Sequence, residues 1–227
     1  MLKTKILKIA SALAAGSLLF AFASCYDGDS SGSEPADTPK QEEGKKDETS
    51  DAADYEYTFD FSTIGSYTSD TKVTYTSDTY YDTVVFLYSK SEGLRIRKDT
   101  NYINYNGSNL NDTTATVGSA YPGSTDVDRY CGFDASKAGV TSDITVEFAY
   151  KVVNSTNASD DTGLIAIVDG NKKVLAVKTG LKVKSGSDTG TISAKIPATD
   201  KAILYFSRGG QNGGGLDVTA ITAKKAN

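Results

Sequence analysis

From residue 55 onward, apolar and polar residues alternate in short runs, which is the pattern of half-buried β-strands. The clearest run is ITVEFAYKV at 144–152. Its inward positions are Ile144, Val146, Phe148 and Tyr150, and its outward positions are Thr145, Glu147 and Lys151. Apolar side chains on one face only indicate a strand that lies against a core and faces water on its other side.

Comparable runs recur, separated by short turn sequences. They are YEYTFDF at 55–61, TVVFLYS at 83–89, GLRIRKD at 93–99, LIAIV at 164–168, KVLAV at 173–177, LKVKSG at 181–186, KAILYFS at 201–207 and LDVTAIT at 216–222. The turn Asp169-Gly170-Asn171 predicts a β-hairpin. About ten to twelve short strands without a helical period predict an all-β domain, an antiparallel β-sandwich of the jelly-roll kind. No unit of roughly 20–50 residues repeats, as it would in a propeller or a β-helix.

The stretch SRGGQNGGGLDVTAI at 207–221 contains five glycines. A phosphate-binding loop follows a strand and opens a helix, whose first N–H groups face the anion. Here the glycines lead into a strand pattern, and the Gly-Lys-Ser/Thr ending of that motif is missing. We therefore expect a glycine-rich hairpin connection between two strands. The alternative is a loop in which glycine lets a ligand approach the backbone.

Residues 1–24 have the pattern of a secretory signal peptide, with three lysines, a short apolar run and small residues before residue 25. The sequence FASC at 22–25 resembles a bacterial lipobox, in which the chain is cut before the cysteine and Cys25 receives a lipid. Acyl chains anchor a protein by burying methylene groups in the bilayer. The alternative is ordinary secretion with an unmodified cysteine. Because Tyr26 follows Cys25, the resemblance implies lipid anchoring at the outer membrane or cell surface.

Residues 25–54 are expected to form a disordered acidic tether after the lipidated cysteine. Residues 26–54 carry ten Asp or Glu and three Lys, a net charge of −7, and lack the apolar residues of a core. Residues 55–227 carry nineteen acidic and eighteen basic residues, a net charge of −1, and suit a single domain. A nearly neutral exported domain is not expected to bind nucleic acid.

The composition also excludes several kinds of catalytic site. The chain has no histidine, which removes Ser-His-Asp catalysis and the usual zinc sites. Cys131 therefore lacks the histidine that often serves a thiol nucleophile as base, and we expect a buried apolar residue rather than a nucleophile. Carboxylate pairs and lyases that use Arg or Lys as base stay possible, although the sequence singles out no pair.

The domain opens with an aromatic strand, and its last strands, Ile203–Ser207 and Leu216–Ile221, flank the glycine-rich stretch. With Arg129, Tyr130 and Phe133 as a central strand, this order resembles a group of bacterial β-jelly-roll modules found beside pectate lyases and pectin esterases. The resemblance covers residues 55–227. It implies an exported carbohydrate-binding-like module. The β-helix that carries pectate lyase chemistry is not visible in this chain.

Tyrosines and arginines are the candidate ligand-binding residues. The chain has fourteen tyrosines and no tryptophan, and a tyrosine ring can stack on a sugar while its hydroxyl forms hydrogen bonds. Arginine binds carboxylates through a fork of donors, so a polyuronate such as pectin is a fitting ligand. The candidate residues are Arg95, Arg97, Tyr102, Tyr105, Arg129, Tyr130 and Arg208. The alternative for each of them is an ordinary place in the core or on a solvated sheet face.

A structural calcium ion joins the first and last strands in many sugar-binding jelly rolls. The matching carboxylates here are Glu56, Asp60 and Asp217. Calcium takes six to eight oxygen ligands, so carbonyl oxygens would have to complete the set. No calcium-loop motif accompanies these residues.

Three functions stay open at this point. The first is a non-catalytic, lipid-anchored module that binds polysaccharide, with pectic polyuronates as the favoured ligand. The second is a small polysaccharide lyase or hydrolase on the same fold, which a cleft holding Arg or Lys beside carboxylates would favour. The third is a structural surface lipoprotein or adhesin, which a sandwich without a tyrosine-lined hollow would favour.

Overall fold

The computed structural model describes residues 55–61, 71–97, 102–105, 113–122, 127–185, 187–210 and 213–227. These residues belong to one compact unit, Glu48–Asn227. The predicted signal peptide at 1–24, the lipidation site Cys25 and the tether at 25–54 lie outside the described residues. Within the described part, every helix is too short or too polar to span a bilayer.

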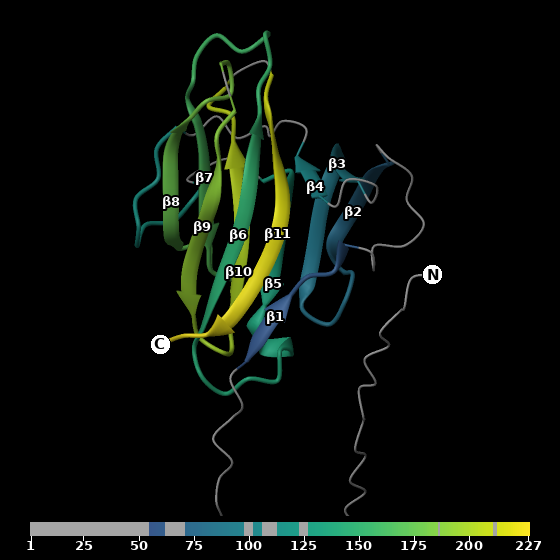
Figure 1. Cartoon of the computed structure of the whole chain (residues 1–227), viewed down its shortest axis with the longest axis vertical. Coiled ribbons are helices and arrows are strands. Elements are labelled where there is room, and N and C mark those ends of the chain that lie inside the picture. Colours follow the sequence, from purple (N-terminus) through teal and green to yellow (C-terminus); the bar gives the residue numbers. More distant parts are fainter. Residues whose placement is uncertain are drawn as a thin grey trace, which may run out of the picture. The chain divides into compact units, whose positions relative to one another are not determined.

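The described residues are almost entirely β-structure (Figure 1). The strands are β1 (Glu56–Thr58), β2 (Thr71–Tyr80), β3 (Val85–Arg97), β4 (Tyr102–Tyr105), β5 (Arg129–Asp134), β6 (Ile144–Val153), β7 (Gly163–Val168), β8 (Val174–Leu181), β9 (Thr189–Ile196), β10 (Lys201–Ser207) and β11 (Gly215–Lys225). One 3₁₀ turn, η2 (Ala135–Lys137), follows β5. The prediction of an all-β antiparallel sandwich is therefore confirmed.

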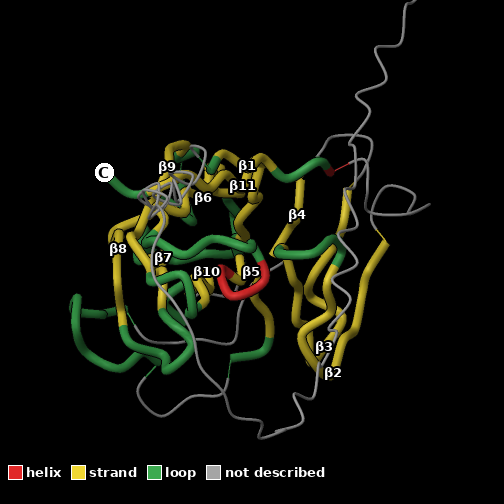
Figure 2. Tube along the Cα trace, turned by 90° about the horizontal axis from the view of Figure 1, so that it is seen from below, coloured by secondary structure: helices red, strands yellow, loops and turns green. Residues whose placement is uncertain are grey.

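The strands form two facing layers (Figure 2). The first layer has the order β8-β7-β10-β5-β3, and the second has the order β3-β4-β11-β6-β9. Strand β1 pairs with β11, and β2 pairs with β3. The hairpin predicted at Asp169-Gly170-Asn171 is confirmed, because β7 and β8 pair on either side of it.

Strand β3 belongs to both layers. Its first half, Val85–Ser89, pairs with β5, and its second half, Leu94–Arg97, pairs with β4. The sequence predicted two separate strands here, at 83–89 and 93–99. In the structure Lys90 is exposed and Leu94, four residues further on, is buried, so the alternation changes phase between them. The pairing of β3 with β2 is irregular at the same place, so an irregularity within one strand explains the change of phase.

The core lies between the inner faces of the two layers. The four predicted inward residues of β6 are all buried there, which confirms the alternation read from the sequence. Tyr105 of β4 crosses this core with its side chain. Its hydroxyl accepts the backbone N–H of Cys131 in β5 and donates to the backbone carbonyl of Leu204 in β10, 3.4 Å away. One buried side chain therefore joins the second layer to two strands of the first.

Two sequence-based predictions about connections are wrong. LKVKSG does not form a strand after Leu181, because carboxylates bind its backbone N–H groups: Lys182 donates to Asp188 and Lys184 to Asp161, each at 2.8 Å. The glycine-rich stretch is not a hairpin either. It leaves β10 in the first layer and enters β11 in the second, so it connects the two layers.

The outer face of the first layer carries a second apolar cluster. Its buried residues are Phe86, Tyr121, Leu164, Ala166, Val168, Val174, Ile203 and Tyr205. Residues 113–122 cover part of it and are tied to β8 and the preceding turn by hydrogen bonds from Gly118 to Val174 and from Tyr121 to Lys172. An outer sheet face with its own apolar cluster differs from the polar outer face that simple alternation predicts.

Candidate functional site

Three tyrosines form a row across the outer face of the first layer. They are Tyr88 of β3, Tyr130 of β5 and Tyr205 of β10, and we call them the tyrosine face. Tyr88 and Tyr130 are paired in register, and their rings are stacked with centroids 4.7 Å apart and planes at 15°. The ring of Tyr130 lies 5.6 Å from that of Tyr205. The sheet thus fixes three neighbouring rings.

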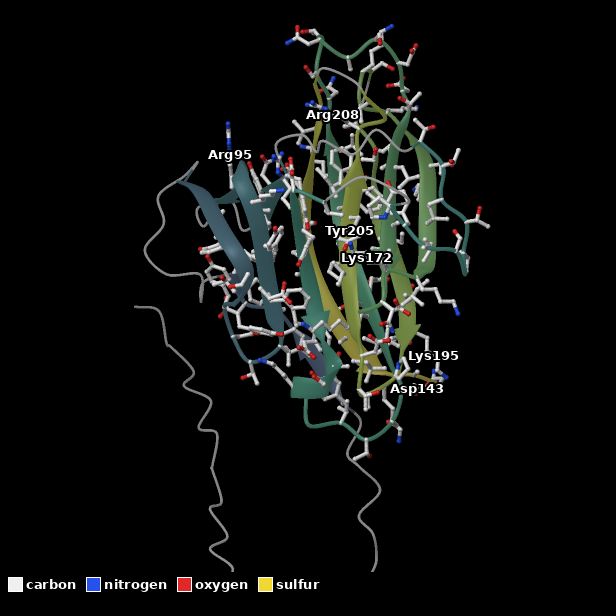
Figure 3. All side chains as sticks on the ribbon, turned by 180° about the vertical axis from the view of Figure 1, so that it is seen from behind. Arg95, Asp143, Lys172, Lys195, Tyr205 and Arg208 are labelled. Carbon is white, nitrogen blue, oxygen red and sulfur yellow. The ribbon has the colours of Figure 1, made fainter. Side chains whose placement is uncertain are left out.

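The tyrosine face lines a hollow of about 280 Å³, together with Lys90, Val127 and Lys172. Figure 3 looks onto this side of the molecule and labels Tyr205 and Lys172 near each other. Both lysines are exposed. The described lining therefore combines aromatic surface with two cationic side chains.

Hydrogen bonding holds Tyr130 in place. Its hydroxyl donates to Asp78, 2.9 Å away, and Lys201 makes a 2.9 Å ion pair with the same carboxylate. Burial, followed by this hydrogen bond, raises the pKa of Tyr130, and burial also raises the pKa of Tyr205 to about 12. Both phenols are therefore neutral at physiological pH.

Lys172 has an unusual backbone. Its φ is 63°, the left-handed region, which a residue with a Cβ adopts at a cost of about 1–2 kcal/mol. The turn enforces this conformation, since the Asp169 carboxylate accepts hydrogen bonds from the backbone of Asn171 and Lys173. Glycine or asparagine would fit this position more easily. A lysine here, with its side chain at the hollow, is consistent with a functional role.

A second hollow, of about 450 Å³, lies where β10 ends and β11 begins. Its described lining is Arg95, Asn104, Val153, Asn154, Ser155, Asn157, Arg208, Gly213, Gly214 and Gly215, and we call it the arginine groove. An adjoining hollow of about 380 Å³ shares three of these residues and adds Tyr102, Lys151 and Asp217, among others. Figure 3 labels Arg95 and Arg208.

The structure brings some of the predicted ligand-binding residues together. Arg95 and Arg208 share the arginine groove, Tyr102 lines the adjoining hollow, and Tyr130 belongs to the tyrosine face. The backbone of Arg97 pairs with that of Tyr102 in the sheet. The Arg97 side chain lies outside the described part of the structure.

Two of the predicted residues are not available to a ligand. Tyr105 is completely buried, because its alternation places it on the inner face of β4. Arg129 is only 7% exposed and lies 3.8 Å from the carboxylate of Asp128. The prediction that these two side chains contact a polysaccharide is wrong.

The sequence analysis missed Tyr88, Tyr205 and Lys90. The alternation could have indicated two of these residues, because Tyr88 and Lys90 both occupy outward positions of one strand. The alternation does not show which strands are paired, and here β3 pairs with β5 and β5 pairs with β10. Only that pairing makes neighbours of tyrosines far apart in the sequence.

Two of the three carboxylates of the predicted calcium site, Glu56 and Asp217, lie far apart. Glu56 lies opposite Lys224 on β11, whereas Asp217 lies opposite Asn104 and Lys151. Seven residues of extended strand separate these two positions, roughly 20 Å. The Asp217 carboxylate accepts a 2.5 Å hydrogen bond from Asn104. Among the described residues, no group of three His, Cys, Asp or Glu could hold a metal ion.

Comparison with known proteins adds little. No protein-family model and no curated protein matches the sequence. The xylan-binding module CBM15 overlaps with 66% of this chain and 96% of its own at 11% identity and a TM-score of 0.39. The K2 adhesin domain of Lys-gingipain overlaps with 63% of this chain and 82% of its own at 15% identity and a TM-score of 0.35. A carbohydrate-binding module of Cellvibrio mixtus lichenase 5A, solved with cellotriose, overlaps with 46% of this chain and 82% of its own at 14% identity and a TM-score of 0.26. Likenesses this weak carry no ligand over to this chain.

Cys131 provides a test of the buried core beneath these sites. Burial raises the pKa of its thiol to about 12, and only the thiolate reacts with disulfide reagents. We expect Cys131 in a Cys25→Ser variant to resist such a reagent at pH 8 until the protein is unfolded with urea. Rapid labelling of the native protein at pH 8 would contradict the described core.

Proposed function

We propose that this protein is a cell-surface lipoprotein whose β-sandwich domain binds polysaccharide, without catalysis, at the tyrosine face. The observation that carries the proposal is the stacked pair of half-buried rings, Tyr88 and Tyr130, which lines a hollow on the outer face of the first layer beside the buried ring of Tyr205. A tyrosine ring offers an apolar surface to the C–H face of a sugar, while polar groups at the rim meet its hydroxyls.

Preorganisation supports this function. Tyr130 is fixed by its stacking on Tyr88 and by its hydrogen bond to Asp78, and the buried ring of Tyr205 supports Tyr130 from the neighbouring strand. Rings that are already ordered lose little conformational entropy when a ligand binds. A rigid tyrosine row on a sheet therefore suits an extended sugar chain.

The two lysines favour an acidic polymer, and we propose pectic polyuronates as the ligand class. Lys90 and Lys172 line the same hollow as the tyrosine rings, and an ammonium group at the rim can pair with a uronate carboxylate. The backbone of Lys172 supports this assignment. Its left-handed conformation is unfavourable for a lysine, and strained residues of this kind cluster at functional sites.

A binding role suits the site better than glycoside hydrolysis. Glycoside hydrolysis needs two carboxylates facing each other across the sugar. The described lining of the tyrosine-face hollow contains no Asp or Glu. The nearby Asp78 is already bonded to Tyr130 and Lys201.

The N-terminal part supplies the proposed anchor. Lipidation of Cys25 would fix the protein to the membrane, and a tether of 25–54 would let the domain reach a polymer. Attachment at the outer membrane or cell surface is part of the same proposal.

Affinity gel electrophoresis of the full-length protein tests the ligand and the site together. We expect polygalacturonate in the gel to retard the protein more than xylan or β-glucan does. Tyr88→Ala should weaken retardation roughly tenfold, because stacking surface is lost, whereas Tyr88→Phe should retain it. Unretarded migration in every gel, or equal retardation of Tyr88→Ala, would overturn the proposal.

The substitution Lys172→Gly tests the role of the lysine charge in binding without lowering the stability of the fold. Glycine adopts a positive φ without strain, so we expect an unchanged or higher thermal midpoint. Retardation by polygalacturonate should nevertheless fall, because the cation is lost, while retardation by a neutral polymer should stay the same. Unchanged binding to polygalacturonate would show that Lys172 does not contact the ligand.

Cys25→Ser tests the anchor. We expect the native protein to incorporate labelled palmitate and to sediment with membranes, and the variant to do neither, because the acylated thiol is missing. Membrane association of the variant equal to that of the native protein would contradict anchoring through Cys25.

A further inference from the structure

We propose that the arginine groove is a second binding site, separate from the tyrosine face, for the carboxylates of an acidic polysaccharide. Its lining comes from five parts of the fold: the second half of β3, β4, the turn after β6, the end of β10 and the glycine-rich connection into β11. A hollow of about 450 Å³ lies within the usual range of ligand sites.

The charge of the groove favours an anion. Two guanidinium groups, those of Arg95 and Arg208, line it, and its described lining contains no Asp or Glu. A concave site whose described lining carries positive charge and no carboxylate concentrates anions.

The polar groups around the arginines identify the kind of anion. Guanidinium binds carboxylate through two parallel N–H donors, a geometry that a lysine cannot provide. Asn154, Asn157 and Ser155 supply amide and hydroxyl groups, which both donate and accept hydrogen bonds. Sugar hydroxyls need such partners and a simple inorganic anion does not. Carboxylates set among hydroxyls are the chemistry of a uronic acid chain.

Glycine gives the groove its shape. A Cβ atom at Gly213 would lie 2.2 Å from the hydroxyl of Ser155, and one at Gly215 would lie 2.6 Å from the backbone oxygen of Tyr105. The connection between β10 and β11 can therefore lie against the turn after β6 and against β4 only without side chains at these two positions. Gly213, Gly214 and Gly215 thus build one wall of the site.

The two sites share no described lining residue, and they belong to different parts of the sandwich. Two independent sites on one domain allow one long polymer, or two chains, to be held at once. Binding to a polymer then exceeds what either site achieves with a short oligomer. The second site does not require that the tyrosine face binds sugar.

Isothermal titration of the full-length protein with trigalacturonate tests this inference. We expect two trisaccharides for each native protein and one for Arg208→Ala. The remaining affinity of Arg208→Ala should equal that of the tyrosine face alone. Arg208→Lys should weaken the groove roughly tenfold, because it keeps the charge and loses the fork of donors. An unchanged thermal midpoint confirms that each variant is folded.

Tyr88→Ala distinguishes the failure of this inference from the failure of the proposed function. If the groove binds and the tyrosine face does not, Tyr88→Ala titrates like the native protein and Arg208→Ala binds nothing. If Arg208→Ala retains the native number of sites and the native affinity, the inference is overturned. It is also overturned if inorganic phosphate binds the groove as tightly as trigalacturonate, because the groove would then take any anion.

Discussion

The domain depends on one strand, β3, being shared by both layers. Its first half pairs with β5 and its second half with β4, so the same backbone closes the sandwich along one edge. This strand also supplies residues to both proposed sites. Tyr88 and Lys90 lie in the hollow of the first layer, and Arg95 lies in the arginine groove. The irregularity between Lys90 and Leu94 lets both sets of side chains avoid the core.

The two layers use their surfaces differently. Their inner faces form one core, which Tyr105 crosses to reach Cys131 and Leu204. The first layer is also apolar on its outer face, where residues 113–122 cover one part and the tyrosine face occupies another. An apolar sheet face that is only partly covered leaves aromatic surface for a ligand, and this supports the proposed polysaccharide site.

Alternation in the sequence predicted the fold class, most strands and the inward residues of β6, because half-buried strands must separate apolar from polar side chains. It could not predict the sites, which depend on pairing between distant strands. Tyr130 was found, but Tyr88 and Tyr205 were not, because only the order β10-β5-β3 makes them neighbours. Tyr105 and Arg129 were misjudged for a different reason, since residue type alone does not show which face of a strand is buried.

The most direct test of the tyrosine face is an NMR titration of the isotope-labelled protein with an oligogalacturonate. The account predicts that the ring signals of Tyr88, Tyr130 and Tyr205 shift together and saturate with one binding curve. Signals of Tyr55 and Tyr57, which pack against the core near β1, should stay unchanged. Shifts at those distant tyrosines alone, or none at the tyrosine face at saturating ligand, would contradict the account.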